Sequence, residues 1–213
     1  MHTRVNLLLA STNAGKLREY RALAAGRAVE VDLLPQFRDI SPFDEDAPTF
    51  AENAAGKALY FSKHFSKDCH RASDEIVFAD DSGLVVPALG GAPGVHSARY
   101  AGANATDAER MAKLLDEMRG KNGDARRAHF VCVVAAAGRG EMLAVFSDSA
   151  EGVIAEEARG RGGFGYDPVF YFPERGKTFA ELSEAEKNEV SHRGKAFRKL
   201  LEYVISPGRV RLG

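Results

Sequence analysis

The sequence predicts an α/β protein in which helices flank a mixed, twisted β-sheet. Short apolar segments alternate with helical patterns in the early part of the chain, as strand–helix–strand units do. Two longer strand-like segments then follow each other across residues 128–149, with only a glycine-containing turn between them, which indicates an antiparallel hairpin. Parallel crossover units followed by an antiparallel pair are typical of a mixed sheet.

The predicted elements of the first part of the chain begin with an apolar strand that runs into a polar turn and a helix. The helix carries Leu17, Tyr20 and Leu23 on one side. In order, we expect a strand over residues 5–10, a helix over 14–25 stopped at Gly26, a strand over 29–34 closed by Pro35, a polar loop over 36–47, a helix from the Thr49–Glu52 capping box to about Phe65, and a polar connection over 66–75.

The second part of the chain is predicted to be richer in strands. Gly90, Gly91, Pro93 and Gly94 mark a turn cluster, and residues 159–165 form a glycine-rich loop. In order, we expect strands over 76–79 and 84–89, a helix from the Thr106–Glu109 capping box to Gly120, strands over 128–137 and 141–149, a short strand over 169–172, and a helix from Ser183 onward with an apolar stripe of Phe197, Leu200, Leu201 and Val204.

Composition limits the classes of protein to which the chain can belong. At 213 residues and 45% hydrophobic content, it can bury one substantial core, so we expect residues 1–213 to form a single domain. The 29 basic and 30 acidic side chains give a formal net charge of −1, which excludes a global attraction to nucleic acid or anionic membrane. Any phosphate site must therefore be local.

Cysteine usage and hydropathy point to a soluble cytosolic protein. Cys69 and Cys132 are the only cysteines, too few for a disulfide framework or a cysteine metal site. The apolar runs are far shorter than the ~20 residues of a membrane span, and the first run is too short for a signal peptide.

Two adjacent carboxylates, Asp80 and Asp81, are the most informative feature. They are expected at the C-terminal end of the strand over 76–79, where ligands bind in open α/β sheets. Neighbouring like charges raise each other's pKa unless a cation lies beside them, and Mg²⁺ is commonly held by one or two carboxylates plus substrate phosphates. An Asx-turn, in which Asp81 or Ser82 caps the loop, is the alternative.

The turn between the first strand and helix offers a local anion site. It reads Ser11, Thr12, Asn13, Ala14, Gly15 and Lys16, and combines hydroxyls, an amide and a lysine at a helix N-terminus. It is not a Walker A motif, because the first glycine is missing. Taken alone, the turn favours a plain N-cap with a solvent-facing lysine, just as the capping box explains Glu52 without any metal.

Two further segments carry candidate ligand-binding groups. The loop Phe164, Gly165, Tyr166 and Asp167 could stack on a base and accept a hydrogen bond from it, or its rings could belong to the core. Lys187, Ser191, His192 and Arg193 gather hydrogen-bond donors near the last helix. The HExxH, CxxC and GxSxG motifs and the kinase signature set are absent from the sequence, so zinc and nucleophilic chemistry lack support.

Five blocks of sequence together resemble the inosine/xanthosine triphosphate pyrophosphatase family in its bacterial form. They are ASTNAGKLRE, TFAENAAGKA, ADDSGLVVPALGGAPGVHSARYAG, FGYDPVF and EKNEVSHRGKAF, which occur in the family's order between about Leu9 and Phe197. The resemblance implies an elongated fold of two lobes around a central cleft, a homodimer, and Mg²⁺-dependent hydrolysis of ITP, dITP and XTP to the monophosphate and pyrophosphate.

The resemblance also implies a role for each matched position. Residues Ser11 to Lys16 would hold the triphosphate, Glu52 and Asp81 would bind the metal, and Asp81 would accept the proton. Ser82 would contact substrate, Phe164 to Asp167 would bind the nucleoside, and Lys187, His192 and Arg193 would read the base. Asp80 matches the motif too, and its division of labour with Asp81 stays open.

Two other functions are compatible with parts of the sequence. A Maf-like nucleotide pyrophosphatase acting on pyrimidine or modified nucleotides is the nearest enzyme, although the STN-x-x-K start and the SHR segment argue against it. A nucleic-acid-binding module would use the RGRGGF segment with Arg126 and Arg127.

Overall fold

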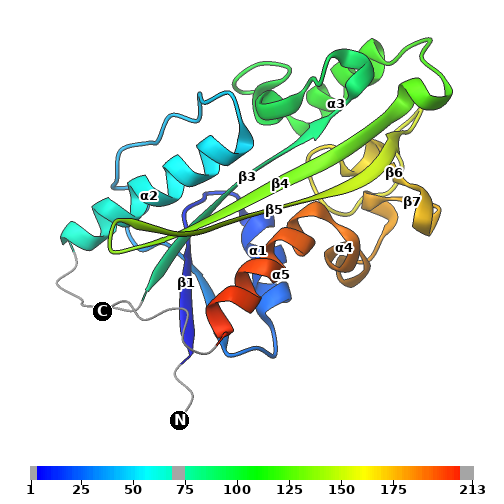
Figure 1. Cartoon of the computed structure of the whole chain (residues 1–213). Helices are drawn as coiled ribbons and strands as arrows, with labels where there is room; N and C mark the ends of the chain where they lie inside the picture. The colour runs from blue at the N-terminus through cyan, green and yellow to red at the C-terminus, as the bar shows by residue number, and fades with distance from the viewer. Residues whose placement is uncertain (1–3, 69–74, 207–213) are drawn as a thin grey trace. The chain divides into compact units, whose positions relative to one another are not determined.

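The computed structural model describes residues 4–68 and 75–206, which form a mixed seven-stranded sheet with helices on its faces (Figure 1). The strand order is β2-β1-β3-β4-β5-β6-β7. Strand β1 pairs in parallel with β2 and β3, whereas β6 pairs antiparallel with β5 and β7. The predicted fold class is confirmed.

The chain divides into two compact units, each built from segments that are separate in sequence. The first unit comprises residues up to 81, 132–148 and from 194 onward, and the second comprises 82–131 and 149–193. The single-domain organisation of residues 1–213 stays a prediction.

The first unit contains two parallel crossover connections around its central strand β1. Its elements are β1 (Val5–Leu9), α1 (Ala14–Ala24), β2 (Val29–Leu33), α2 (Phe50–Asp68), the first part of β3 (Ile76–Val85), the adjoining parts of β4 (Arg127–Gly138) and β5 (Glu141–Ile154), and most of α5 (His192–Ile205). Helix α1 connects β1 to β2 on one side, and α2 connects β2 to β3 on the other. Because such crossovers are right-handed, α1 and α2 lie on opposite faces of the sheet.

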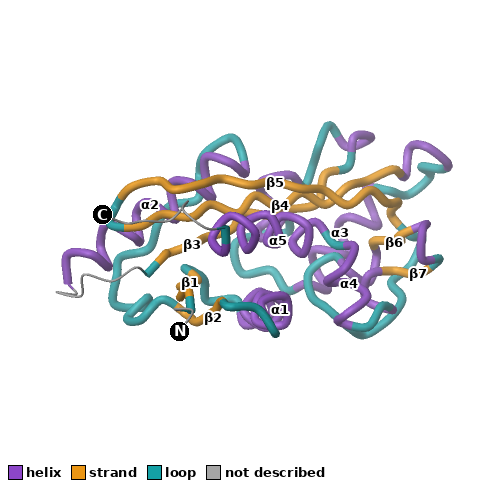
Figure 2. The backbone as a smooth tube through the Cα atoms, turned by 60° about the horizontal axis from the view of Figure 1, so that its bottom comes forward, coloured by secondary structure: helices purple, strands orange, loops and turns teal. Residues whose placement is uncertain are grey.

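An aromatic trio anchors the core of the first unit. The ring centroids of Tyr20, Phe78 and Phe197 lie 4.5–5.4 Å apart and join α1, β3 and α5. Helices α1 and α5 therefore pack on the same face of the strands (Figure 2). Offset and tilted pairs of this kind stabilise a core beyond the area that they bury.

The second unit has a separate aromatic core. Phe130 of β4 packs against Phe170 at 4.6 Å, and Phe170 packs against Phe179 at 4.8 Å between ring centroids. The unit's elements are the end of β3, α3 (Asp107–Glu117), the adjoining parts of β4 and β5, β6 (Phe170–Phe172), β7 (Lys177–Thr178) and α4 (Glu184–Val190).

The course of β3 differs from the prediction. The strand continues to Val85, so Asp80 and Asp81 lie inside it rather than at its end. The separate strand predicted over 84–89 is wrong, because Leu84 and Val85 finish β3 and Pro87–Leu89 form a 3₁₀ turn. A buried strand can carry two carboxylates only if each has a partner, and both do, as shown below.

The remaining differences concern ends of elements and one division. Ser191, with ψ of 153°, separates α4 from α5, so the single helix predicted from Ser183 is wrong. Helix α2 reaches Asp68, β5 reaches Ile154, and the short strand β7 was not predicted. The rest of the connection predicted over 66–75, including Cys69, lies at 69–74, outside the described residues. Within those residues, no helix has the length and apolar character needed to cross a bilayer.

Candidate active site

The two adjacent aspartates of β3 face opposite sides of the sheet. Successive side chains of a strand alternate, so Asp80 shares a face with Phe78, which packs against α1 and α5. Asp81 points to the other face, where α2 lies. The two carboxylates therefore have different direct partners, and the metal role expected for Asp81 stays a prediction.

Asp80 is paired with the lysine of the β1–α1 turn. Its carboxylate is fully buried, and its Oδ1 lies 2.9 Å from Lys16 Nζ, while the Lys16 side chain remains 16% exposed. Cys132 Sγ lies 4.0 Å from the other oxygen, Oδ2. A buried carboxylate needs such a cation, and in return it fixes the direction of the ammonium group.

The turn that contains Lys16 is an ordered helix N-terminus. Asn13 is the N-cap of α1 and its Oδ1 accepts a hydrogen bond from Lys16 N at 3.1 Å, while Ser11 Oγ accepts one from Asn13 N at 3.1 Å. Thr12 and Asn13 are exposed. The N-cap that the sequence left as an alternative is present, but Lys16 pairs with Asp80 and is not the solvent-facing lysine of that alternative. The turn thus combines the positive end of a helix dipole with an oriented ammonium group.

Asp81 is held by an asparagine that the sequence reading did not single out. Asn53 of α2 donates from Nδ2 to Asp81 Oδ2 at 3.1 Å. The same side chain also accepts from Ala47 N at 3.0 Å and donates to Ala47 O at 3.3 Å, so it ties the preceding loop to β3. The signal for Asn53 was its place directly after Glu52 in the capping box.

Burial raises the pKa of Asp81 to about 6. The hydrogen bond from Asn53 and the charge of Lys16 lower the pKa, and the charge of Glu45 raises it. Asp80 makes the smallest contribution, as expected for a carboxylate on the opposite face. Asp81 is thus a buried carboxylate that changes protonation close to neutral pH, which is the property of a general base.

Glu52 performs the capping role, one of the two roles that the sequence left open. Its Oε2 accepts a hydrogen bond from Thr49 Oγ1 at 2.7 Å, and its N donates to Thr49 Oγ1 at 3.2 Å, so it caps α2. The side chain is exposed and belongs to the residue next to Asn53, the partner of Asp81. One turn further on, Lys57 forms an ion pair with Glu45.

A second group of predicted residues comes together in the second unit, around the ring of Phe164. Lys187 Nζ lies 4.9 Å and the Arg193 guanidinium carbon 5.2 Å from the ring centroid. Lys187 Nζ also pairs with Asp167 Oδ2 at 2.5 Å, and Arg193 donates to Ser82 Oγ at 2.8 Å. Lys187 and Arg193 are buried, so the surrounding side chains fix the positions of their charges.

The other two predicted side chains of this group belong to the core packing. Tyr166 is buried, and its hydroxyl donates to Ser97 O at 2.9 Å. The His192 ring is buried and stacks on Phe130 with centroids 4.5 Å apart and planes at 8°. Tyr166 therefore supports the loop, while Phe164 and Asp167 meet the cations.

Close packing explains two glycines of the RGRGGF segment. A Cβ at Gly160 would lie 2.4 Å from the carbonyl carbon of Ala180, and one at Gly163 would lie 2.0 Å from Asp167 Oδ2. Arg126 donates to the carbonyl oxygens of Met118, Lys121, Ile154 and Ala155. The basic surface that the nucleic-acid alternative requires is therefore not provided by Arg126.

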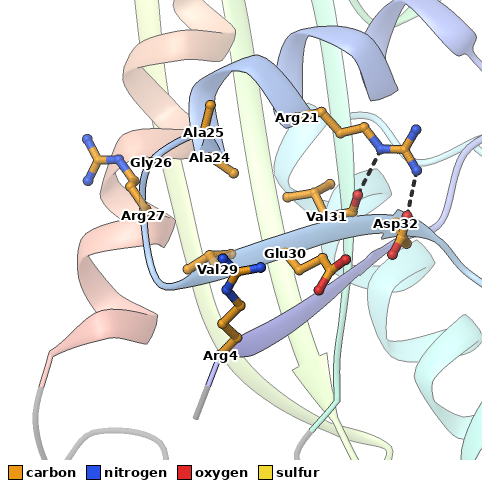
Figure 3. A pocket seen from close by; sticks show the side chains of 10 residues that line it. All are labelled: Arg4, Arg21, Ala24, Ala25, Gly26, Arg27, Val29, Glu30, Val31 and Asp32. Carbon is orange, nitrogen blue, oxygen red and sulfur yellow. Dashed lines mark hydrogen bonds and ion pairs between the residues drawn. The ribbon is translucent and has the colours of Figure 1, made fainter. Parts of the chain in front are cut away.

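The lining of a shallow pocket of about 360 Å³ includes none of these site residues (Figure 3). It is lined by Arg4 and Val29, at the beginning of β1 and β2, whereas Ser11 follows the end of β1. Arg21 donates to Val31 O and Asp32 Oδ1, and the guanidinium groups of Arg4, Arg21 and Arg27 do not converge. The pocket therefore does not form an anion site.

Comparison with known proteins identifies the family. A model of the Ham1 family matches residues 7–203, which include every site residue predicted from the sequence. The chain belongs to the Ham1 family.

Similar Ham1-family proteins span nearly the whole chain. The dITP/XTP pyrophosphatase of Geobacillus kaustophilus is 53% identical over 92% of this chain and 92% of its own length. The dITP/XTP pyrophosphatase of Thermus thermophilus is 48% identical over 93% and 91%. The solved structure of a HAM1 protein from Coxiella burnetii is 39% identical, covers 94% of this chain and 98% of its own, and superposes with a TM-score of 0.79.

The Ham1 assignment confirms the family resemblance deduced from the five sequence blocks. It also favours that function over the Maf-like alternative. In this Ham1-family chain, Asp81 belongs to the first group of candidate residues and Ser82 to the group around Phe164. The two residues are consecutive in β3.

Proposed function

We propose that this protein hydrolyses the non-canonical purine nucleoside triphosphates ITP, dITP and XTP to the monophosphate and pyrophosphate. The names of the relatives that match over most of the chain support this substrate class. The observation that carries the chemistry is Asp81, a buried carboxylate with a pKa raised to about 6 and oriented by Asn53. Such a group can remove a proton from water at neutral pH.

We assign the triphosphate to the β1–α1 turn formed by Ser11, Thr12, Asn13, Ala14, Gly15 and Lys16. The helix N-terminus and the Lys16 ammonium attract phosphate oxygens, and Asp80 holds that ammonium in place. Asp80 then acts through Lys16, whereas Asp81 acts on water. Because the two side chains face opposite sides of β3, Asp80 serves phosphate binding and Asp81 serves proton transfer.

The donor set fits Mg²⁺. Asp81 and Glu52 provide hard carboxylate oxygens, and the Asn53–Asp81 hydrogen bond joins the strand and helix that carry them. No group of three or more His, Cys, Asp or Glu side chains within residues 4–68 and 75–206 is arranged to hold a metal, which suits an ion held by one or two carboxylates and the substrate phosphates. When bound, Mg²⁺ would neutralise charge on the phosphate oxygens.

We assign the nucleoside to the group around Phe164. Its ring offers a stacking surface, and Lys187 and Arg193 beside it supply donors for the oxygen at position 6 of hypoxanthine or xanthine. The family resemblance gives the same role to His192, although its ring packs on Phe130. Adenine carries an amino donor there and would leave a buried donor unpaired, at a cost of ~1–3 kcal/mol. Ser82, bonded to Arg193, would contact the substrate beside it.

One assay tests this function. Purified protein is incubated with Mg²⁺ and ITP, dITP, XTP, ATP or GTP in ¹⁸O-labelled water, and pyrophosphate and orthophosphate are measured separately. We expect pyrophosphate from the first three, with the label in the monophosphate, because water attacks the α-phosphorus. Orthophosphate carrying the label, with accumulation of IDP, would contradict the mechanism.

The proposal includes three properties that rest on the family resemblance. These are Mg²⁺ as the cofactor, a homodimeric assembly, and a cytoplasmic location suited to removing deaminated purines from the nucleotide pool. Sedimentation of the purified protein measures the assembly directly.

A further inference from the structure

The Phe164 loop is clamped by two carboxylates that come from different elements. Asp167 Oδ2 accepts a hydrogen bond from Phe164 N at 2.8 Å and contacts Lys187. The next amide, Gly165 N, donates to Oδ2 of Asp107 at 2.6 Å, although Asp107 is 58 residues away in sequence. The backbone N–H groups of Phe164 and Gly165 are thus held by two different carboxylates.

Asp107 is oriented by an arginine on its own helix. It is the first residue of α3, and its Oδ1 forms an ion pair with Arg110, whose side chain is 18% exposed. The capping of α3 is performed by Thr106 and Glu109. Both oxygens of Asp107 therefore make contacts that are not part of the helix cap, and a simple capping role does not account for this residue.

Further contacts close a circuit through the segment Gly94–Arg99. Arg110 Nη1 donates to Ala98 O, and the Tyr166 hydroxyl donates to the neighbouring Ser97 O at 2.9 Å. The path runs from Gly165 to Asp107, Arg110 and Ala98, and returns through Ser97 and Tyr166. A closed path restricts the loop more than any single hydrogen bond does, because movement at one point strains the others.

We propose that Asp107, held by Arg110, is a positioning residue that sets the affinity for the nucleoside by fixing the backbone beneath Phe164. The proposal rests on the proposed function for its substrate. Gly165 has a positive φ of 64° and no Cβ, so the peptide between Phe164 and Gly165 would rotate readily without an acceptor for its N–H. Such rotation would move the Phe164 ring away from Lys187 and Arg193.

The variants Asp107→Ala and Asp107→Asn separate the two contacts of this carboxylate. Alanine removes the acceptor for Gly165 N and the partner of Arg110, whereas asparagine keeps an acceptor oxygen. Asp116→Ala is a matched control, because Asp116 of α3 also pairs with an arginine three residues on, Arg119 just after the helix, but lies on the exposed surface. Loss of one hydrogen bond of this kind corresponds to roughly a 10-fold effect on affinity.

We expect Asp107→Ala to raise KM for ITP ~10-fold with kcat nearly unchanged, and to weaken IMP binding equally in calorimetry without metal. Hydrogen exchange at the Gly165 amide should accelerate by ~10-fold or more in Asp107→Ala. In KM, IMP affinity and exchange rate, Asp107→Asn should fall between wild type and Asp107→Ala. Asp116→Ala should match wild type in all three measurements.

Unchanged exchange at Gly165 in Asp107→Ala, or a loss confined to kcat, would overturn the proposal. Should Asp107→Ala fail to fold, Asp107→Asn and Arg110→Met provide the same comparison. Failure of the wild-type protein to hydrolyse ITP would instead contradict the proposed function, and the amide exchange would still decide whether Asp107 fixes the loop.

Discussion

Asp80 and Asp81 show that a shift of one residue along a strand changes the partner of a carboxylate and so its chemistry. Both are buried, yet one meets Lys16 from α1 and the other meets Asn53 from α2. The sequence indicates that the two aspartates carry chemistry, but it does not show that they face opposite sides of the sheet. Side chains alternate between the faces only within a strand, and the sequence did not show that β3 continues past Asp81. The residue types were predictable, and their partners depended on tertiary packing.

Replacement of Asp81 by asparagine should abolish turnover and stabilise the metal-free protein. The native carboxylate has a pKa of about 6 against a reference value of 3.8. Between these values the native state binds more protons than the unfolded state, so this group's contribution to stability falls as pH rises from 4 to 6. At pH 7.5 its removal should add at most about 3 kcal/mol to the free energy of unfolding.

Urea unfolding in the presence of a chelator at pH 4.5 and pH 7.5 measures this effect of Asp81→Asn. The exposed Asp116→Asn serves as the control. Near-wild-type turnover with Mg²⁺, or a lower stability than wild type at pH 7.5, would refute the assignment. In the wild type, kcat/KM should fall as pH decreases below about 6, because the base becomes protonated.

Asp80→Asn should raise KM for ITP while leaving the Mg²⁺ requirement unchanged. The amide keeps the volume but not the charge that holds Lys16, and loss of a charged hydrogen bond costs about 1.5–3 kcal/mol. A double-mutant cycle with Lys16→Met checks the contact itself. Additive effects on KM, or a higher Mg²⁺ concentration for half-maximal activity, would rule out the proposed division between Asp80 and Asp81.

At the scale of the elements, the helix starts were the most predictable features. The capping box at Thr106–Glu109 and the side-chain cap at Thr49–Glu52 occur where their sequences indicate, because they depend on only four residues. The end of β3 and the division at Ser191 were missed, because each depends on partners distant in sequence. Ser191 itself is a residue favoured at helix ends, but the apolar stripe that follows hid this signal.

The capping boxes should make the fold sensitive to acid. Hydrogen bonds from Thr106 lower the pKa of Glu109, so its stabilising contribution is present above the unfolded value of 4.5 and is lost as pH falls through the native value. Glu109→Gln retains a hydrogen-bonding side chain and should show a shallower decrease in stability between pH 5 and pH 3. Thermal unfolding at several pH values tests this, and equal slopes for the two proteins would contradict it.

Gly163 and Gly165 offer a matched pair within the Phe164 loop. Both have positive φ, but a Cβ at Gly163 meets Asp167 whereas one at Gly165 meets nothing within 4 Å. Gly165→Ala should cost about 1 kcal/mol from backbone strain alone. Gly163→Ala should cost more than about 3 kcal/mol, because it displaces the buried partner of Lys187. Similar losses for both variants in urea unfolding would show that the space around Gly163 is not limiting.

At the scale of the whole molecule, the boundaries between the two compact units fall inside continuous elements. They cut β3 after Asp81, β4 before Cys132, β5 after Asp148 and α5 after Arg193. Neither unit is a single continuous stretch of chain, because β3, β4, β5 and α5 each contribute residues to both. The sequence predicted the mixed sheet, but it could not show this interleaving, which depends on pairing between distant segments.

The interleaving predicts a single cooperative unfolding transition. Native-state hydrogen exchange should give the same opening free energy for the amides of Phe78 in the first unit and Phe170 in the second, because neither core survives without the shared strands. Two transitions in urea, or opening free energies that differ by more than about 2 kcal/mol, would show that the units unfold independently.

The position of α5 in the chain also sets the order in which the protein can mature during translation. Phe197, Leu200 and Leu201 complete a core whose other walls, β1 and α1, are synthesised first. Until α5 leaves the ribosome, the apolar face around Tyr20 and Phe78 has no cover from this helix. The nascent chain therefore carries an uncovered apolar surface through most of its synthesis, which is the kind of surface that chaperones bind.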